Sequence, residues 1–110
     1  MHTHISQPIH MLLDDVKAGL RTLYGHRLRG LYLFGSYARN EQDKESDVDV
    51  LVVLDDFAHY GAEVDRTSDL TARLSLQHGV SISKVFLREQ DWLRGQTPFL
   101  ANVREEAIAT

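Results

Sequence analysis

The 110-residue sequence contains no cysteine and no long apolar run. Without cysteine, the chain can form neither disulfides nor thiolate metal sites. No apolar stretch approaches the roughly 18 residues that a membrane helix needs, so we expect no membrane association. The first residues, Met1-His2-Thr3-His4, have neither the basic segment nor the apolar core of a signal peptide. We therefore expect a soluble, cytoplasmic protein.

An excess of basic charge is also missing. Sixteen acidic residues oppose twelve basic ones, which gives a net charge of −4. Proteins that bind nucleic acid usually present a basic face, so we expect no direct nucleic-acid partner. The segment from 41 to 69 holds ten of the acidic residues and only two basic ones, Lys44 and Arg66. Most of these acids are interpreted as a solvated surface, but a metal site would need only two or three of them.

The hydrophobic share of 43% and the charged share of 25% are ordinary for a globular protein. A chain of 110 residues has the commonest domain size, so we expect a single domain over residues 1–110. With the elements described next, the pattern predicts the α/β (α+β) class, with a small mixed sheet flanked by helices.

Apolar residues at three- and four-residue steps predict an amphipathic helix over residues 9–24. Leu70, Ala72, Leu74 and Leu76 alternate as in a strand, but the long polar segment 60–78 favours a helix. Strands are predicted at 28–34, 48–54 and 80–87. A turn into a short helix is predicted at 35–42, and a helical turn at 89–93. A last helix, opened by Thr97-Pro98, is expected to carry Leu100, Val103 and Ala107 inward. We expect Leu51, Val53, Ile82 and Phe86 to pack against helices led by Leu13 and Leu20.

Gly35-Ser36 follows the first predicted strand, at the point where a helix is expected to begin. Free backbone N–H groups at such a point can bind an anion, and glycine allows a phosphate to approach the backbone closely. The Ser36 hydroxyl would add another donor. Because Gly-Ser turns are common, this feature alone is a weak indication.

Asp47 and Asp49 lie two residues apart at the start of a predicted buried strand, so both carboxylates should leave the same face. Paired carboxylates repel each other unless a cation lies between them. Magnesium binds carboxylates together with phosphate oxygens and water. The ten residues between Ser36 and Asp47 suffice for a return loop, which would bring the phosphate turn beside these acids.

Gly-Ser, ten residues and then Asp-x-Asp resembles the signature of the polymerase-β-like nucleotidyltransferases. The run Phe34-Gly35-Ser36-Tyr37-Ala38-Arg39 is similar to the minimal nucleotidyltransferase (MNT) branch, and so is the segment 102–106. The resemblance implies that Gly35 and Ser36 hold the triphosphate of ATP, that Arg39 steadies it, and that Asp47 and Asp49 are catalytic residues that bind Mg²⁺.

One position departs from the family pattern. Many members carry a third carboxylate on the next long strand, where Ser83 stands in this chain. Asp65, Asp69 or Asp91 could replace that acid only if the fold brought one of them close. Asn40 also stands where a glycine is frequent.

Members of the MNT branch typically act as antitoxins beside an all-helical HEPN toxin. The resemblance therefore implies transfer of AMP to a tyrosine hydroxyl of a HEPN partner. The alternative is a module with weak or no catalysis that binds nucleotide and neutralises the HEPN partner by masking it. Transfer to a small molecule is less favoured because no substrate-binding domain is apparent. The sequence leaves homo-oligomer formation open.

Overall fold

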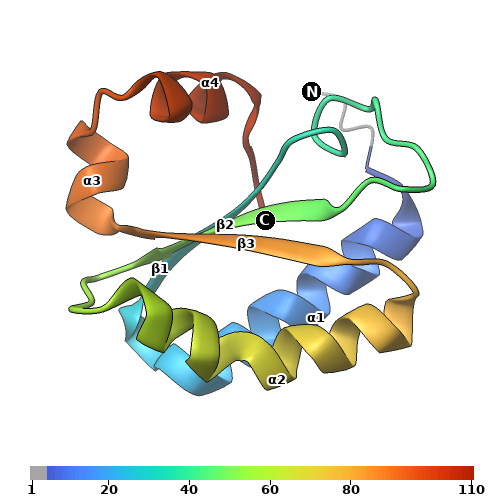
Figure 1. The fold of residues 1–110 in the computed structure, drawn as a ribbon, viewed down its shortest axis with the longest axis horizontal. Helices are drawn as coiled ribbons and strands as arrows, with labels where there is room; N and C mark the ends of the chain where they lie inside the picture. Colours follow the sequence, from blue (N-terminus) through green and yellow to red (C-terminus); the bar gives the residue numbers. More distant parts are fainter. Residues whose placement is uncertain (1–4) are drawn as a thin grey trace.

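A computed structural model describes residues 5–110, and the first four residues, on which the expectation of no signal peptide rests, lie outside that range. A sheet of four strands separates two layers of helices (Figure 1). Helices α1 and α2 cover one face of the sheet, and α3 and α4 cover the other. This arrangement confirms the predicted fold class.

The sheet has the strand order β3-β2-β1-β4 and is mixed. Strands β1 and β2 are antiparallel, β2 and β3 are parallel, and β4 adds to β1 antiparallel. The bounds are β1 Leu28–Phe34, β2 Val48–Leu54, β3 Ile82–Arg88 and β4 Ile108–Ala109. The first three agree with the predicted strands to within two residues. Strand β4 was not predicted because two residues are too short to show an alternating pattern.

The helices are α1 Gln7–Tyr24, α2 Tyr60–His78, α3 Glu89–Arg94 and α4 Pro98–Glu106, and a short 3₁₀ turn, η1, covers Gly25–Arg27. Gly25, with a φ of 58°, ends α1, and the left-handed Gly79 ends α2. Thr97 caps α4 through its side-chain oxygen, which accepts a hydrogen bond of 3.2 Å from the Leu100 N–H. Ala107, predicted to lie within this last helix, comes just after its end. No helix within residues 5–110 combines the length and apolar character needed to cross a membrane.

Strand β2 is the centre of the core, and its side chains alternate between two hydrophobic clusters. The α1–α2 cluster contains fourteen buried residues: Leu12, Leu13, Val16, Leu20, Tyr24, Leu31, Leu33, Val48, Val50, Val52, Leu54, Leu70, Leu74 and Phe86. The α3–α4 cluster contains three buried residues, Leu51, Val53 and Val103. The prediction that Leu51 and Val53 pack against Leu13 and Leu20 was therefore wrong, because these two side chains leave the opposite face of the sheet. Ile82 and Phe86 do pack in the α1–α2 cluster, as predicted.

Strand β3 forms one edge of the sheet, and α2 carries the chain from β2 to this parallel neighbour. Lys84 lies on the β3 face that α2 covers, and its ammonium donates a hydrogen bond of 2.9 Å to the Thr71 hydroxyl. Removal from water lowers the pKa of Lys84. A cation on an edge strand thus points into the molecule.

Candidate active site

The segment after β1 is a turn, and the short helix predicted for residues 35–42 does not form. The Gly35 carbonyl accepts hydrogen bonds from the N–H groups of Ala38 and Arg39, at 3.0 and 3.1 Å. Asn40 then adopts a left-handed conformation, with a φ of 58°, which stops helical propagation. We call residues 35–40 the phosphate turn, after the role predicted for them.

Gly35 touches the carboxylate of Asp49. Its φ of +75° disfavours any residue with a side chain, and a Cβ atom built there would lie 2.1 Å from Asp49 Oδ2. Strand pairing explains the contact, because Phe34 is the partner of Asp49 in the β1–β2 register. Glycine is therefore needed both for backbone conformation and for space.

Asp49 is the second residue of β2, and Asp47 immediately precedes the strand. Burial raises the pKa of Asp49, and the negative charge of Asp47 raises it further, while Arg39 and the Ser83 hydroxyl act in the opposite direction. The negative charge of Asp47 thus makes ionisation of Asp49 less favourable. A hard divalent cation would relieve that repulsion, so this donor pair fits Mg²⁺ with remaining positions filled by phosphate and water.

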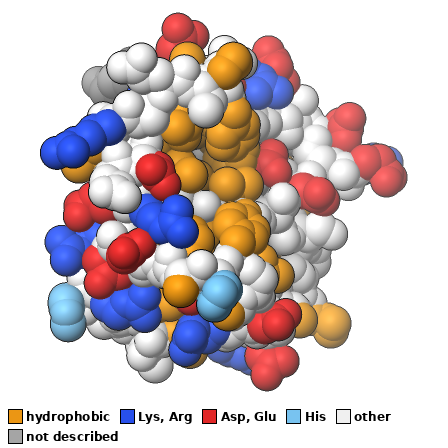
Figure 2. Space-filling view, turned by 60° about the vertical axis from the view of Figure 1, so that its left-hand side comes forward, with side chains coloured by type: hydrophobic (Ala, Val, Ile, Leu, Met, Phe, Trp, Pro, Cys, Tyr) orange, Lys and Arg blue, Asp and Glu red, His pale blue; other side chains and the backbone are white. Residues whose placement is uncertain are grey.

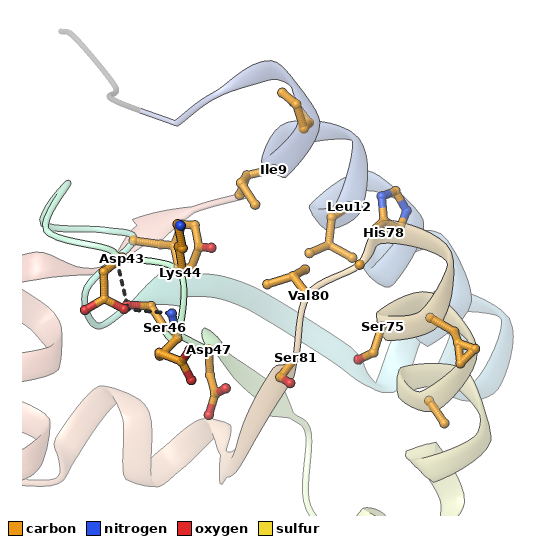
Figure 3. A pocket seen from close by; sticks show the side chains of 16 residues that line it. Ile9, Leu12, Asp43, Lys44, Ser46, Asp47, Ser75, His78, Val80 and Ser81 are labelled. Carbon is orange, nitrogen blue, oxygen red and sulfur yellow. Dashed lines mark hydrogen bonds between the residues drawn. The ribbon is translucent and has the colours of Figure 1, made fainter.

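The loop before Asp47 is held by its own polar side chains. The Ser46 hydroxyl accepts a hydrogen bond of 2.9 Å from the Asp43 N–H and contacts the Asp43 carboxylate at 3.3 Å (Figure 3). A groove of about 790 Å³ opens beside this loop, between the first turns of α1 and the end of α2. Asp47 lies at one border of the groove, and Ile9 and Val80 form apolar parts of its wall.

Ser83 pairs with Asp49 in the parallel β2–β3 register, so its hydroxyl lies on the strand beside this carboxylate. The acids considered as replacements lie elsewhere: Asp65 and Asp69 are exposed on α2, and Asp91 lies 3.5 Å from Arg88. Within residues 5–110, no three histidine or acidic side chains lie close enough together to hold a metal ion. Asp47 and Asp49 therefore remain the two candidate carboxylate ligands.

A known protein family matches most of the chain. Residues 13–106 match the family described as nucleotidyltransferase domain. The chain belongs to this family. The match includes the phosphate turn, both aspartates and all of α4.

Two relatives of this nucleotidyltransferase come from Methanocaldococcus jannaschii, each named "Putative protein adenylyltransferase". One is 37% identical over 71 residues, which cover 64% of this chain and 65% of the relative. The other is 31% identical over 78 residues, which cover 71% of this chain and 78% of the relative. The chain thus spans less than two thirds of the first relative's length.

Solved structures share the fold. A toxin–antitoxin crystallised with AMP-PNP superposes with a TM-score of 0.61 at 23% identity, covering 87% of this chain and 69% of that chain. A mutant of the toxin–antitoxin MntA-HpeT superposes with a TM-score of 0.62 at 21% identity and the same coverage. At these identities, the likeness supports the fold of the nucleotidyltransferase.

One residue at the candidate site was not predicted from the sequence. The Gly35 N–H donates a hydrogen bond of 2.6 Å to Glu106 Oε2, and Arg39 Nη1 lies 3.1 Å from Glu106 Oε1. Glu106 is the last residue of α4, 71 positions from Gly35. No local spacing links such distant residues, so the contact is visible only in three dimensions.

A second groove, of about 560 Å³, runs between the phosphate turn and α4. Phe34 and Phe99 border it and meet edge to face, with ring centroids 6.0 Å apart. Arg39 and Asn102 supply polar parts of the wall. The phosphate turn therefore opens onto a space with both aromatic and polar surfaces.

Proposed function

We propose that this nucleotidyltransferase transfers AMP from ATP to a tyrosine hydroxyl of a HEPN-type toxin and thereby acts as its antitoxin. The observation that carries the proposal is the contact between Gly35 of the phosphate turn and the Asp49 carboxylate. A triphosphate on the turn would lie beside the acids that fit Mg²⁺. The adenylyltransferase names of the relatives support a protein as the acceptor, and the toxin–antitoxin structure with AMP-PNP supports an adenine nucleotide as the donor.

The phosphate turn supplies the donors for the triphosphate. Backbone N–H groups at Gly35 and Ser36, the Ser36 hydroxyl and the Arg39 guanidinium would bind its β- and γ-phosphates. Asp47 and Asp49 would hold Mg²⁺. When bound, the ion neutralises triphosphate charge and makes the α-phosphorus a better target for attack.

The acceptor tyrosine would be oriented by docking of the toxin. Its oxygen must reach the α-phosphorus in line with the departing pyrophosphate, and such orientation can lower a barrier by several kcal/mol. Ser83 supplies no carboxylate to draw off the phenolic proton, and a free tyrosine has a pKa of about 10. We therefore expect proton removal to limit the rate.

Nucleotide binding can be tested by calorimetry with ATP and magnesium. The double variant Asp47→Asn with Asp49→Asn should lose most of the magnesium-dependent affinity, because neutral amides cannot balance the cation. Equal ATP affinity of the unaltered protein in magnesium and in a chelator would refute the proposed site.

Transfer can be tested with a purified HEPN-type toxin as the acceptor. Intact-mass spectrometry after incubation with ATP and magnesium should show the toxin heavier by one or more AMP units. Ser83→Asp should raise the rate if the missing acid limits catalysis. Ser68→Asp, on the exposed side of α2, adds the same charge away from the site and should leave the rate unchanged.

A second candidate function is neutralisation of the toxin by binding alone. It is favoured by the hydroxyl at Ser83 and by exposed apolar side chains, among them Leu93, 69% exposed, and Phe99, 45% exposed. At the end of the molecule that carries α3, hydrophobic side chains form a band with charged groups to either side (Figure 2). A stable complex with no AMP on the toxin, for both the unaltered protein and Ser83→Asp, would favour this function.

A further inference from the structure

The donors proposed to hold phosphate are already engaged by an anion of the chain itself. Glu106 accepts from the Gly35 N–H at 2.6 Å and from Arg39 Nη1 at 3.1 and 3.2 Å. Two oxygens of one carboxylate thus meet one backbone donor and one guanidinium of the phosphate turn. These contacts join α4 directly to the turn.

A carboxylate and a phosphate compete for such donors, because both are anionic oxygen acceptors with similar hydrogen-bond lengths. The Gly35 N–H has a single hydrogen and cannot serve both fully. We propose that Glu106 is an internal competitor that occupies the phosphate turn and that a triphosphate binds by displacing its side chain. The inference rests on the proposed role of the turn in binding nucleotide, and it adds a residue that sets the affinity.

The backbone around Glu106 is held on both sides, so the displacement is a rotation of the side chain. The Ala107 N–H bonds to the Val103 carbonyl at 2.7 Å, and the Thr110 N–H bonds to the Leu31 carbonyl at 3.0 Å. Strand β4 begins two residues after Glu106 and pairs with β1. A movement of the whole segment would break these bonds.

Space for the rotated side chain exists beside the turn. The groove of about 560 Å³ adjoins Glu106, and the side chain is already 22% exposed. In the groove, the carboxylate would regain water and leave Arg39 to a phosphate oxygen. Arg39 also contacts Glu41 at 2.9 Å, so one partner of the guanidinium remains when Glu106 departs.

Occupancy by Glu106 reduces the apparent affinity for phosphate chains. If only the open fraction binds, the apparent dissociation constant rises by the inverse of that fraction. Glu106→Gln keeps the size of the side chain but removes its charge, so it should shift the turn toward the open form. Glu105→Gln removes the same charge from the neighbouring exposed position, which lines the same groove, and serves as the control for loss of charge alone.

Inorganic tripolyphosphate tests the competition without any need for nucleotide or transfer. In calorimetry, Glu106→Gln should bind it about tenfold more tightly than the unaltered protein, since a charge-assisted bond is replaced by a weaker neutral one. Glu105→Gln should change affinity by less than about twofold, the scale of a screened surface charge. Weaker binding by Glu106→Gln, or equal effects of the two variants, would overturn the inference.

Nuclear magnetic resonance of the unaltered protein gives a second measurement that does not depend on variant folding. Tripolyphosphate should shift the Gly35 amide and the Glu106 carboxyl carbon with one common titration curve. A shifted Gly35 amide with an unchanged Glu106 carboxyl would overturn the inference, and so would an unchanged Gly35 amide. If both signals shift together but no AMP is transferred to the toxin, the proposed function would be refuted and the competition by Glu106 would stand.

Discussion

Gly35 meets two constraints at a single backbone position. Its φ of +75° lies in the left-handed region, and its Cα faces the Asp49 carboxylate with no room for a methyl group. Gly79 has a similar φ of +68°, but among residues 5–110, its chain neighbours apart, no atom lies within 4 Å of a Cβ built there. The two glycines therefore separate the effect of backbone strain from the effect of crowding at the site.

We predict that Gly79→Ala loses about 1 kcal/mol of unfolding free energy, the cost of left-handed backbone for alanine. Gly35→Ala should lose more, because its methyl group must also displace Asp49, and it should lose magnesium-dependent ATP binding. Urea denaturation and calorimetry measure the two effects. Normal ATP affinity in Gly35→Ala would contradict the close contact.

The arrangement of Gly35, Asp47 and Asp49 follows from sequence spacing, because strand alternation and a short return loop are local properties. The family resemblance pointed to Ser83 on the next long strand, and the β2–β3 register sets it beside Asp49. Glu106 does not follow from any such rule. It reaches the turn only because α4 folds back over the sheet and β4 pairs with β1.

At the scale of elements, α1 and α2 pack closely where Gly19 meets Leu70. A Cβ atom built on Gly19 would lie 2.4 Å from Leu70 Cδ1, and Leu70 is itself buried. Gly61, in the first turn of α2, has open space around it. One helical glycine is thus required for packing, and the other is not.

We expect Gly61→Ala to raise the unfolding free energy by about 0.5–1 kcal/mol, since alanine has the higher helix propensity. Gly19→Ala gains the same propensity but forces Leu70 out of its place, and a net loss of about 1–3 kcal/mol is expected. Thermal or urea unfolding of the two variants provides the comparison. A Gly19→Ala variant as stable as Gly61→Ala would mean that the two helices lie farther apart.

Element positions were predictable where a pattern runs long enough to be read. Helix α1 has five buried residues at helical spacing, and β2 is apolar from Val50 to Leu54. The segment 35–42 was mispredicted because a left-handed Asn40 stops the helix, a choice that local composition does not reveal. The face assignment of Leu51 and Val53 failed because β2 is buried on both sides, so its sequence does not show which cluster each residue joins.

On the scale of the molecule, the two hydrophobic clusters are unequal. The α1–α2 cluster contains fourteen buried residues, whereas the α3–α4 cluster contains three. Local stability follows the amount of buried apolar contact. We therefore expect the α3–α4 layer, which carries Glu106, to have a lower local stability than the α1–α2 layer.

We predict that native-state hydrogen exchange separates the two layers. Amides of α4 should exchange through an opening of lower free energy and weaker denaturant dependence than amides of α1, because less apolar surface is exposed. The amides of α1 are the internal reference for global unfolding. Identical free energies and denaturant slopes for both helices would show a single cooperative unit.

The inward lysine on the edge strand bears on self-association. An edge strand offers unpaired backbone groups to a second copy of the chain. An inward-pointing charge on that strand opposes edge-to-edge pairing, because the charge would lose water in the joined sheet. Lys84→Met should therefore give an equally folded protein whose apparent mass in sedimentation increases with concentration. Lys44→Met, which loses the same charge from an exposed loop, should remain unchanged. Lys84 would then act to keep separate molecules from joining their sheets.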